Sequence, residues 1–382
     1  MLADFPDLTL GIEEEYLLVD KKTGTLVTDA PEGLLEECQT VAPDQVSPEF
    51  LRSQIEVGTK VCHSLAEARQ DLAGLRDTII GITGEYGLAP IAASSHPSGQ
   101  WWQQKTTDGV RYNALANEMQ TAARRLVICG MHVHIGVPEN AMRIDLLNQL
   151  SYFLPHMLAL STSSPFWDGR NTGLKSYRLT VFDALPRTGL PERFASYAEY
   201  CRHVEVLTNA GLIEDASKIW WDMRPSVRYP TLEMRVTDVC TRLDDAVAIA
   251  ALYACIVRMM YRLRTHNQRW RIYSPMLIRE NRWRAIRYGF DAGMIDLAKG
   301  RVVSFSDLLE ELIDLTAEDA EALDCVAEIN SLRDILVRGS SAHQQVACYE
   351  QAISEGADEH AALQQVVRHL VEETRAHQQS GA

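Results

Sequence analysis

The sequence lacks the short motifs by which many enzyme classes are recognised. It contains no Gly-x-x-x-x-Gly-Lys-Ser/Thr phosphate loop, no Gly-x-Gly-x-x-Gly fingerprint, no Gly-x-Ser-x-Gly elbow and no His-Glu-x-x-His helix. These absences argue against P-loop nucleotide binding, the Rossmann fold, the α/β-hydrolases and the helical zinc peptidases. A nucleotide, if one is bound, is then expected to be held through metal ions and arginine side chains.

Cysteine pairs and long apolar runs are also missing. No two of the eight cysteines stand at CxxC spacing, so we interpret them as small buried side chains in a reducing cytoplasm. Residues 1–7 carry no basic segment before an apolar run, so we expect no signal peptide. The longest apolar run, 246–257, is shorter than the roughly 20 residues of a membrane span and predicts a core helix.

Basic residues are in the minority. Lys and Arg total 37 against 52 Asp and Glu, which gives a formal net charge of −15. A chain this acidic is a poor binder of nucleic acid or of an anionic membrane surface. We therefore expect neither as a partner, and expect small molecules instead.

The chain shows no internal repeat, low-complexity tract or flexible linker, so we predict one domain over 1–382. Strand-like segments lie in 1–243, helical patterns dominate 244–377, and 378–382 is expected to be a frayed tail. Strands and helices do not alternate regularly, which argues against a parallel barrel or a doubly wound sheet. We predict an α+β fold in which an antiparallel sheet has helices packed on one face.

Three helices have clear signals. The capping box Ser64-Leu-Ala-Glu67 predicts a helix over 64–86. A helical pattern over 143–163 contains Pro155, which predicts a kink or a break. A third, strongly apolar helix is predicted over 244–265.

Four predicted strands share one pattern, in which polar side chains alternate with apolar ones. They are 8–19, 53–61, 126–137 and 231–238. Successive side chains of a strand point to opposite faces, so each strand has an apolar face and a face with charged or imidazole groups. If the four strands join one sheet, these groups converge on one surface: Glu13, Glu15, Glu56, His132, His134, Glu233 and Arg235. Asp238 falls on the apolar side and must lie past the strand end or after a bulge.

Several carboxylates on one surface need a neutralising charge, because like charges raise each other's pKa. A hard divalent cation, Mg²⁺ or Mn²⁺, suits an oxygen-rich site with an occasional imidazole. Glycines at 11, 58, 130 and 136 on the same faces indicate close approach of a ligand or backbone. The alternative is a solvated sheet with a polar outer face. His132-Val-His134 also resembles metal-dependent hydrolases on barrels, but the repeated strand–helix units of a barrel are missing.

Two arginine-rich segments are candidates for binding phosphate or carboxylate. The segment 164–178 has the glycines and turn residues of a functional loop, and 280–291 has the pattern of a helix. Their basic residues are Arg170, Lys175, Arg178, Arg282, Arg284 and Arg287. The alternative for the second segment is an ordinary basic helix face.

Five segments together resemble the type 2 glutamate–cysteine ligase family, whose bacterial members are often called carboxylate–amine ligases. They are GIEEEYLLVD at 11–20, GMHVHIG at 130–136, SYR at 176–178, LEMRVTD at 232–238 and NRWRAIRYG at 281–289. The resemblance runs from about residue 5 to about residue 375. It implies a single catalytic domain with a glutamine-synthetase-like fold. In that fold an antiparallel sheet of about six strands binds ATP and Mg²⁺ on its concave face, with helices behind.

The resemblance also implies roles for single residues. The metal-site positions are Glu13, Glu15, Glu56, His132 and Glu233. Arg178 and Arg235 match catalytic positions that meet phosphate or substrate carboxylate, and both bind ATP together with His134. Asp238 follows the last catalytic strand, and a loop over 96–111 is expected to exclude water.

The activity implied is an ATP-dependent ligation in the cytoplasm by a homodimer or larger assembly. The γ-carboxylate of L-glutamate is phosphorylated, and L-cysteine or another amine attacks the acyl phosphate to give a γ-glutamyl amide, ADP and phosphate. Two alternatives stay open. ADP formation without an amide product would favour a guanidino-kinase-like phosphotransferase, and metal binding without nucleotide affinity would favour a non-catalytic binding module.

Overall fold

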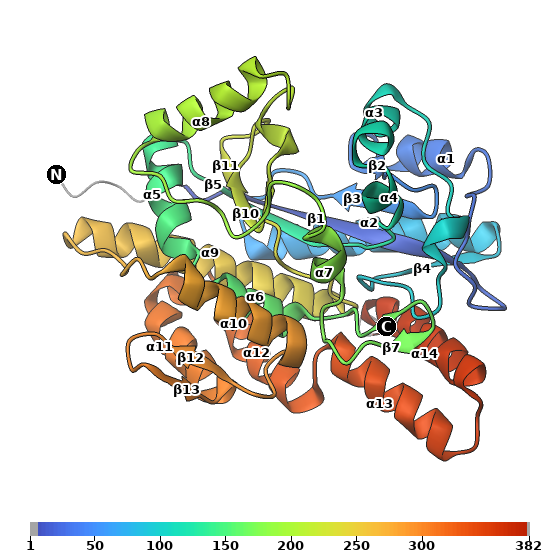
Figure 1. The fold of residues 1–382 in the computed structure, drawn as a ribbon. Coiled ribbons are helices and arrows are strands. Elements are labelled where there is room, and N and C mark those ends of the chain that lie inside the picture. Colours follow the sequence, from blue (N-terminus) through green and yellow to red (C-terminus); the bar gives the residue numbers. More distant parts are fainter. Residues whose placement is uncertain (1–6, 380–382) are drawn as a thin grey trace.

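A computed structural model describes residues 7–379, which are built around one antiparallel sheet (Figure 1). Its strands follow the order β10-β11-β5-β1-β3-β2, and β4 pairs with the end of β1. Their bounds are β1 Leu10–Asp20, β2 Val46–Pro48, β3 Gln54–Gly58, β4 Leu88–Ile91, β5 Met131–Gly136, β10 Met223–Pro225 and β11 Thr231–Met234. The four predicted strands therefore adjoin one another in the order 231–234, 131–136, 10–20 and 54–58.

The register places the predicted polar residues directly opposite one another. Glu13 pairs with His132 on one side, Glu15 pairs with Glu56 on the other, and Glu233 pairs with His134. Directly opposed residues of adjacent strands project from the same face, with Cβ atoms about 5 Å apart. The alternation therefore does bring these side chains together on one surface.

The apolar face of the sheet is covered by two long helices, α2 (Leu65–Glu85) and α9 (Leu243–Thr265). The capping box forms, since the amide of Glu67 donates to Ser64 Oγ at 3.1 Å. α9 is the one described helix long and apolar enough to cross a membrane, but 78% of its most apolar window is buried within the fold. It is a core helix, as its sequence predicts.

One charged side chain lies on the covered face of the sheet. Glu14 is fully buried and forms two hydrogen bonds with Arg76 of α2, at 2.7 and 2.9 Å. Arg76 also donates to the carbonyl oxygens of Cys240 and Thr241, both at 2.8 Å. The exception in the alternation of β1 is thus a paired charge that joins three distant parts of the chain.

The remaining helices surround this core (Figure 1). They are α1 Leu34–Val41, α3 Val110–Met119, α4 Thr121–Arg124, α5 Asn140–Leu150, α6 Leu154–Ser161, α7 Arg178–Phe182, α8 Tyr197–Asn209, α10 Pro275–Tyr288, α11 Phe305–Ala322, α12 Val326–Arg338, α13 Ser341–Ser354 and α14 Glu359–Thr374. Short 3₁₀ turns are η1 Trp101–Gln103, η2 Ala216–Lys218 and η3 Ala376–Gln379. The predicted helix is broken at 151–153, between α5 and α6, and Pro155 lies in the first turn of α6, where a proline is tolerated.

Three small two-stranded sheets lie outside the main one. They pair β6 Phe166–Trp167 with β7 Arg170–Asn171, β8 Thr188–Gly189 with β9 Trp220–Trp221, and β12 Met294–Asp296 with β13 Arg301–Val303. The last pair lies within the mainly helical part of the chain. Of the predicted tail, 380–382 lies outside the described residues.

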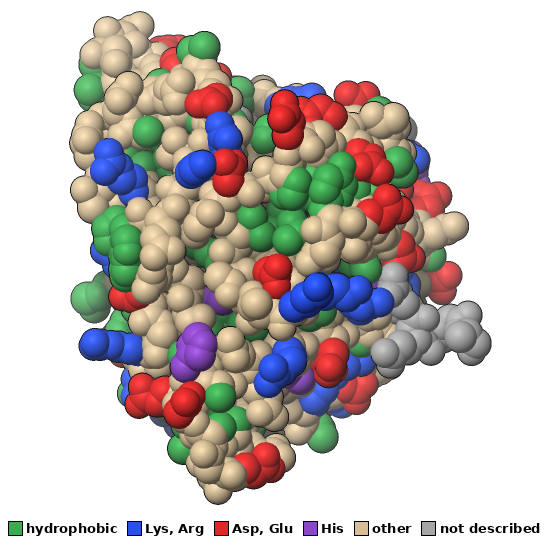
Figure 2. Space-filling view, turned by 90° about the vertical axis from the view of Figure 1, so that its right-hand side faces the viewer, with side chains coloured by type: hydrophobic (Ala, Val, Ile, Leu, Met, Phe, Trp, Pro, Cys, Tyr) green, Lys and Arg blue, Asp and Glu red, His purple; other side chains and the backbone are tan. Residues whose placement is uncertain are grey.

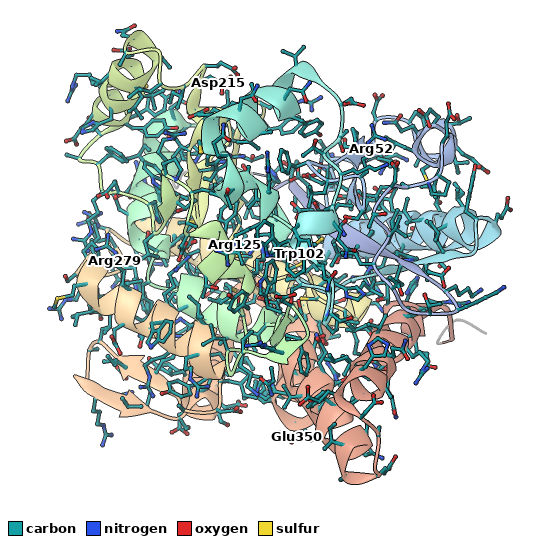
Figure 3. The ribbon with its side chains drawn as sticks, turned by 45° about the vertical axis from the view of Figure 1, so that its right-hand side comes forward. Arg52, Trp102, Arg125, Asp215, Arg279 and Glu350 are labelled. Atoms are coloured by element: carbon teal, nitrogen blue, oxygen red, sulfur yellow. The ribbon has the colours of Figure 1, made fainter. Side chains whose placement is uncertain are left out.

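The polar face of the sheet is flanked by two groups of helices, α8 on one side and α3 with α4 on the other (Figure 1). Asp215, after α8, and Arg52, between β2 and β3, mark these two sides in Figure 3. The face of the molecule drawn in Figure 2 mixes acidic, basic and apolar side chains rather than presenting one charge.

Candidate active site

A cavity of about 470 Å³ opens on the polar face of the sheet. It is lined by every residue predicted for the site: Glu13, Glu15, Glu56, His132, His134, Arg178, Glu233 and Arg235. The strands supply six of these side chains, Arg235 directly follows β11, and Arg178 comes from the first turn of α7. The structure therefore brings these eight predicted side chains together in one cavity.

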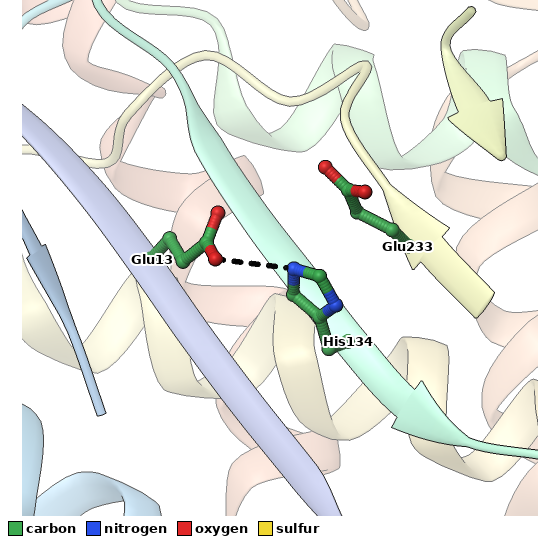
Figure 4. Close-up of side chains that lie close together, drawn as sticks. All are labelled: Glu13, His134 and Glu233. Carbon is green, nitrogen blue, oxygen red and sulfur yellow. Dashed lines mark ion pairs between the residues drawn. The ribbon is translucent and has the colours of Figure 1, made fainter. Parts of the chain in front are cut away.

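The first candidate cation site consists of Glu13, His134 and Glu233 from three adjacent strands (Figure 4). One ligand atom from each lies within 4.8 Å of the others. His134 Nε2 is 3.3 Å from Glu13 Oε1 but has no hydrogen-bond partner, although it is buried. Its Nδ1 shares a hydrogen bond with Thr231 Oγ1 at 2.9 Å, which fixes the ring with Nε2 towards the carboxylates.

The charges around this site favour a positive group there. Burial would lower the pKa of His134, but its close contact with Glu13 and the charge of Glu233 raise it. Burial would raise the pKa of Glu13, but its contacts with His132 and His134 hold it well below its usual value. A buried nitrogen without a partner between two ionised carboxylates fits a divalent cation.

The second candidate cation site consists of Glu15, Glu49 and Glu56, whose oxygens also approach within 4.8 Å of one another. Burial and the charge of Glu49 raise the pKa of Glu15 to about 8, and the same two causes raise that of Glu56 well above its usual value. A bound cation would allow Glu15 and Glu56 to ionise beside Glu49. This all-oxygen set fits Mg²⁺ or Mn²⁺.

His132 lies between the two sites. Its Nδ1 is 3.1 Å from Glu13 Oε2, and its Nε2 is 3.9 Å from Glu15 Oε1. Burial and the charge of Arg235 lower its pKa to about 4, so it is neutral at pH 7. The ligand geometry with Glu13 and Glu233 therefore belongs to His134, which was predicted to contact the nucleotide, whereas His132 bridges the two acidic groups.

Two arginines hold Glu233 from either side. Arg224 of β10 donates to it at 2.8 and 3.2 Å, and Arg235 donates to it through Nη1. Burial would raise the pKa of Glu233, but these two cations hold it far below its usual value. The Nε atom of Arg235 is buried without a hydrogen-bond partner. This cationic nitrogen on the cavity wall can serve an anionic ligand.

Arg178 lies at the floor of the cavity and is only 4% exposed. Its guanidinium donates to the carbonyl oxygens of Val236 at 3.3 Å and Arg235 at 3.2 Å. The guanidinium passes directly over Gly130, where an added Cβ would lie 2.9 Å from its Cζ atom. A glycine at this position is what lets the arginine reach the sheet.

Asp238 lies past the end of β11, as expected from its place in the alternation, and forms an isolated bridge with Gly130. It is fully buried and accepts three hydrogen bonds, from Ser163 N at 2.9 Å, Ser164 Oγ at 2.8 Å and Ser176 Oγ at 2.9 Å. These contacts fasten the segment that carries Arg178. Asp238 therefore anchors the segment from beneath, and it does not line the cavity.

Several predicted candidates lie elsewhere. Arg282 is buried in ion pairs with Asp183 and Asp222, each at 2.6 Å, and ties α10 to the rest of the fold. The other basic side chains of the two segments, Arg170, Lys175, Arg284 and Arg287, do not line the cavity. The predicted 96–111 loop is also absent from its lining among the described side chains, and α3 forms this rim instead.

Sequence reasoning missed four charged residues that line the cavity: Glu49, Lys218, Arg224 and Arg228. Glu49 follows β2 and Arg224 lies in β10, and both strands have three residues. Such short strands show no alternation. The only local signal at the first is Pro48, which ends the strand.

Solved structures define the class of fold. A glutamate–cysteine ligase from Francisella tularensis in complex with AMP superposes with a TM-score of 0.67, at 15% identity, over 97% of this chain and 89% of that one. A bifunctional glutathione synthetase from Pasteurella multocida gives the same TM-score and identity, over 97% of this chain and 52% of that one. The chain thus has the fold of the glutamate–cysteine ligases, which confirms the predicted fold class.

Sequence comparison gives the family. Residues 9–369 match the family model of glutamate–cysteine ligase family 2. A protein of Rhodospirillum rubrum provisionally named glutamate–cysteine ligase 2 is 56% identical over 97% of this chain and 96% of its own length. A protein of the same provisional name from Jannaschia sp. is 54% identical over 98% of this chain and 99% of its own length. The chain belongs to glutamate–cysteine ligase family 2, as its motifs indicate.

Proposed function

We propose that this protein is an ATP-dependent carboxylate–amine ligase that forms a γ-glutamyl amide from L-glutamate and an amine, with L-cysteine as the reference amine. The observation that carries the proposal is the convergence of two acidic cation sites and two arginines in one cavity. Membership of the glutamate–cysteine ligase family supports it. A carboxylate does not condense with an amine in water without activation, and this set of groups suits phosphoryl transfer.

The proposed site holds Mg²⁺, or Mn²⁺ in its place, at Glu13–His134–Glu233 and at Glu15–Glu49–Glu56. The unpartnered Nε2 of His134 and the mutually repelling carboxylates fit such ions. Bound there, a divalent cation would offset the negative charge of the phosphate oxygens and make the γ-phosphorus more electrophilic.

The protein's own groups orient the reaction. Arg235, through its free Nε, and Arg178 at the cavity floor bind phosphate oxygens. The γ-carboxylate of glutamate attacks the γ-phosphorus and ADP leaves. The nitrogen of the amine then attacks the acyl carbon, phosphate leaves, and the amide remains. Positioning and electrostatic stabilisation supply the rate, so no nucleophile from the protein is required.

The test is phosphate release from Mg-ATP in the presence of glutamate, measured with and without single amines and with the amide product identified by mass. Glu13→Gln keeps the size of a cation ligand and removes its charge, so turnover should fall about a hundredfold or more. Glu350→Gln is the control, because this exposed residue lies on α13 at the end of the molecule away from α8 (Figure 3).

Other outcomes would point elsewhere. ADP formed with a phosphorylated product and no amide would replace the proposal by a phosphotransferase. Cation binding without any nucleotide turnover would replace it by a binding module. Normal turnover in Glu13→Gln would remove the first cation site from the mechanism.

A further inference from the structure

The cavity has two chemically different ends, which lie at opposite edges of the sheet. One end lies beside β2, β3 and α3, and the other beside β10 and β11. The first end contains the Glu15–Glu49–Glu56 set, and we call it the apolar end because six further lining residues form an apolar wall beside that set: Pro48, Phe50, Tyr112, Leu115, Leu126 and Ile128.

The apolar wall is held in place by specific contacts. Tyr112 and Leu115 lie three residues apart and so share one face of α3. The hydroxyl of Tyr112 donates to the carbonyl oxygen of Pro48 at 2.6 Å, and its ring meets that of Phe50 edge-on at 6.3 Å between centroids. The wall is therefore built from three separate segments, and these contacts fasten two of them, 48–50 and 112–115, to each other.

A polar group without a partner lies at the same end. Gln54 of β3 lines the cavity and is 7% exposed. Its Nε2 donates to the carbonyl oxygen of Ile128 at 2.7 Å, but its Oε1 is buried and accepts no hydrogen bond. An unsatisfied buried acceptor costs free energy, so a donor such as the N–H of an amine is its natural complement.

The opposite end suits a nucleotide better. There the cavity is lined by the cationic side chains of Lys218, Arg224 and Arg228 and by the aromatic rings of Trp220 and Tyr229. Cations complement a polyphosphate, and aromatic faces complement a purine. The apolar wall complements an apolar side chain, which glutamate lacks, and this leaves the acceptor amine as its ligand.

We propose that the apolar end binds the acceptor amine, with Gln54 Oε1 accepting from its nitrogen, and that the preferred amine has an apolar side chain larger than that of cysteine. This inference rests on the proposed ligase activity. Each carbon buried on the wall should raise kcat/KM about fourfold. The wall is much larger than the single thiol-bearing carbon of cysteine needs.

The experiment compares alanine, cysteine, leucine and phenylalanine as amines at fixed Mg-ATP and glutamate. We expect kcat/KM for leucine to exceed that for alanine at least tenfold, and to exceed that for cysteine. Leu115→Asn should cut the leucine-to-alanine ratio severalfold. Val110→Asn is the control, since Val110 lies on the same helix, is 91% exposed and does not line the cavity; it should leave this ratio unchanged.

The outcomes separate this inference from the proposed function. Amide formation that favours alanine or cysteine overturns the inference and supports the ligase. An equal change of the ratio in both variants overturns it too, as does a change in the KM for ATP in Leu115→Asn that leaves the ratio intact. If no amine gives an amide, the ligase proposal fails. Calorimetric binding of leucine and alanine to the Mg²⁺-loaded protein then decides the inference: tighter leucine binding supports it, and equal or absent binding overturns it.

Discussion

Gly130 determines where the guanidinium of Arg178 lies. In Gly130→Ala, the new methyl group would overlap that guanidinium, whose Cζ would be 2.9 Å away, so the arginine must leave the sheet. If Arg178 binds phosphate oxygens, turnover should fall about tenfold or more while the fold persists. Steady-state phosphate release and circular dichroism measure the two effects.

Gly58→Ala is the matched control for that variant. Gly58 lies on the same sheet opposite Glu13, but a Cβ there would be 3.7 Å from the nearest atom, which is ordinary van der Waals contact. Its turnover should stay within about threefold of the parent value, far less than the loss in Gly130→Ala. Equal losses in the two variants would show that strand packing, and not the position of Arg178, matters at Gly130.

At the scale of single elements, prediction succeeded where a strand is long enough to show its period. β1 has 11 residues and places Glu13 and Glu15 by alternation alone. β2 and β10 have three residues each, so the positions of Glu49 and Arg224 depend on their neighbours in space and have no period of their own. The candidate cation site that contains Glu49 could therefore be predicted only in part.

The join between β1 and α2 gives a prediction about stability. Arg76→Met leaves Glu14 buried without its cation, which should lower the free energy of unfolding by about 3–5 kcal/mol. The double variant Arg76→Met with Glu14→Leu removes the stranded charge and should recover part of that loss. Urea denaturation measures both, and a single-variant loss below about 1 kcal/mol would contradict this account of the pair.

At the scale of the whole molecule, two buried histidines outside the cavity, His96 and His156, make stability depend on pH. Burial lowers the pKa of His96 and of His156 to about 4 in the folded protein. In the unfolded chain the pKa of a histidine is about 6.5, so between pH 6.5 and 4 the unfolded chain binds protons that the folded protein does not. Their contribution is complete above pH 6.5 and is lost as pH falls towards 4. Each should lower the free energy of unfolding by up to about 1.4 kcal/mol per pH unit in that window.

His156→Phe tests this dependence. The ring of His156 lies among Tyr152, Phe153 and Phe305, so phenylalanine suits the site and cannot titrate. Between pH 6.5 and 4, the free energy of unfolding should fall less steeply with decreasing pH than in the parent, and the difference should equal the contribution of one histidine. Denaturation at several pH values measures this slope. An unchanged slope would mean that His156 does not report on acid unfolding.

The hydrogen bonds that join Arg76 to Glu14, Cys240 and Thr241 also have a consequence for folding during translation. Arg76 and Thr241 are 165 positions apart. During translation, Arg76 therefore cannot bind the carbonyl oxygens of Cys240 and Thr241 until that later segment has left the ribosome. At roughly 5–20 residues per second, synthesis of the intervening chain takes about 8–33 s. A nascent chain that has only its first strands therefore cannot complete the contacts that cover the apolar face of the sheet. In a chain stalled before Cys240, Arg76 lacks two of its acceptors, and chaperones would meet an N-terminal half with this network incomplete.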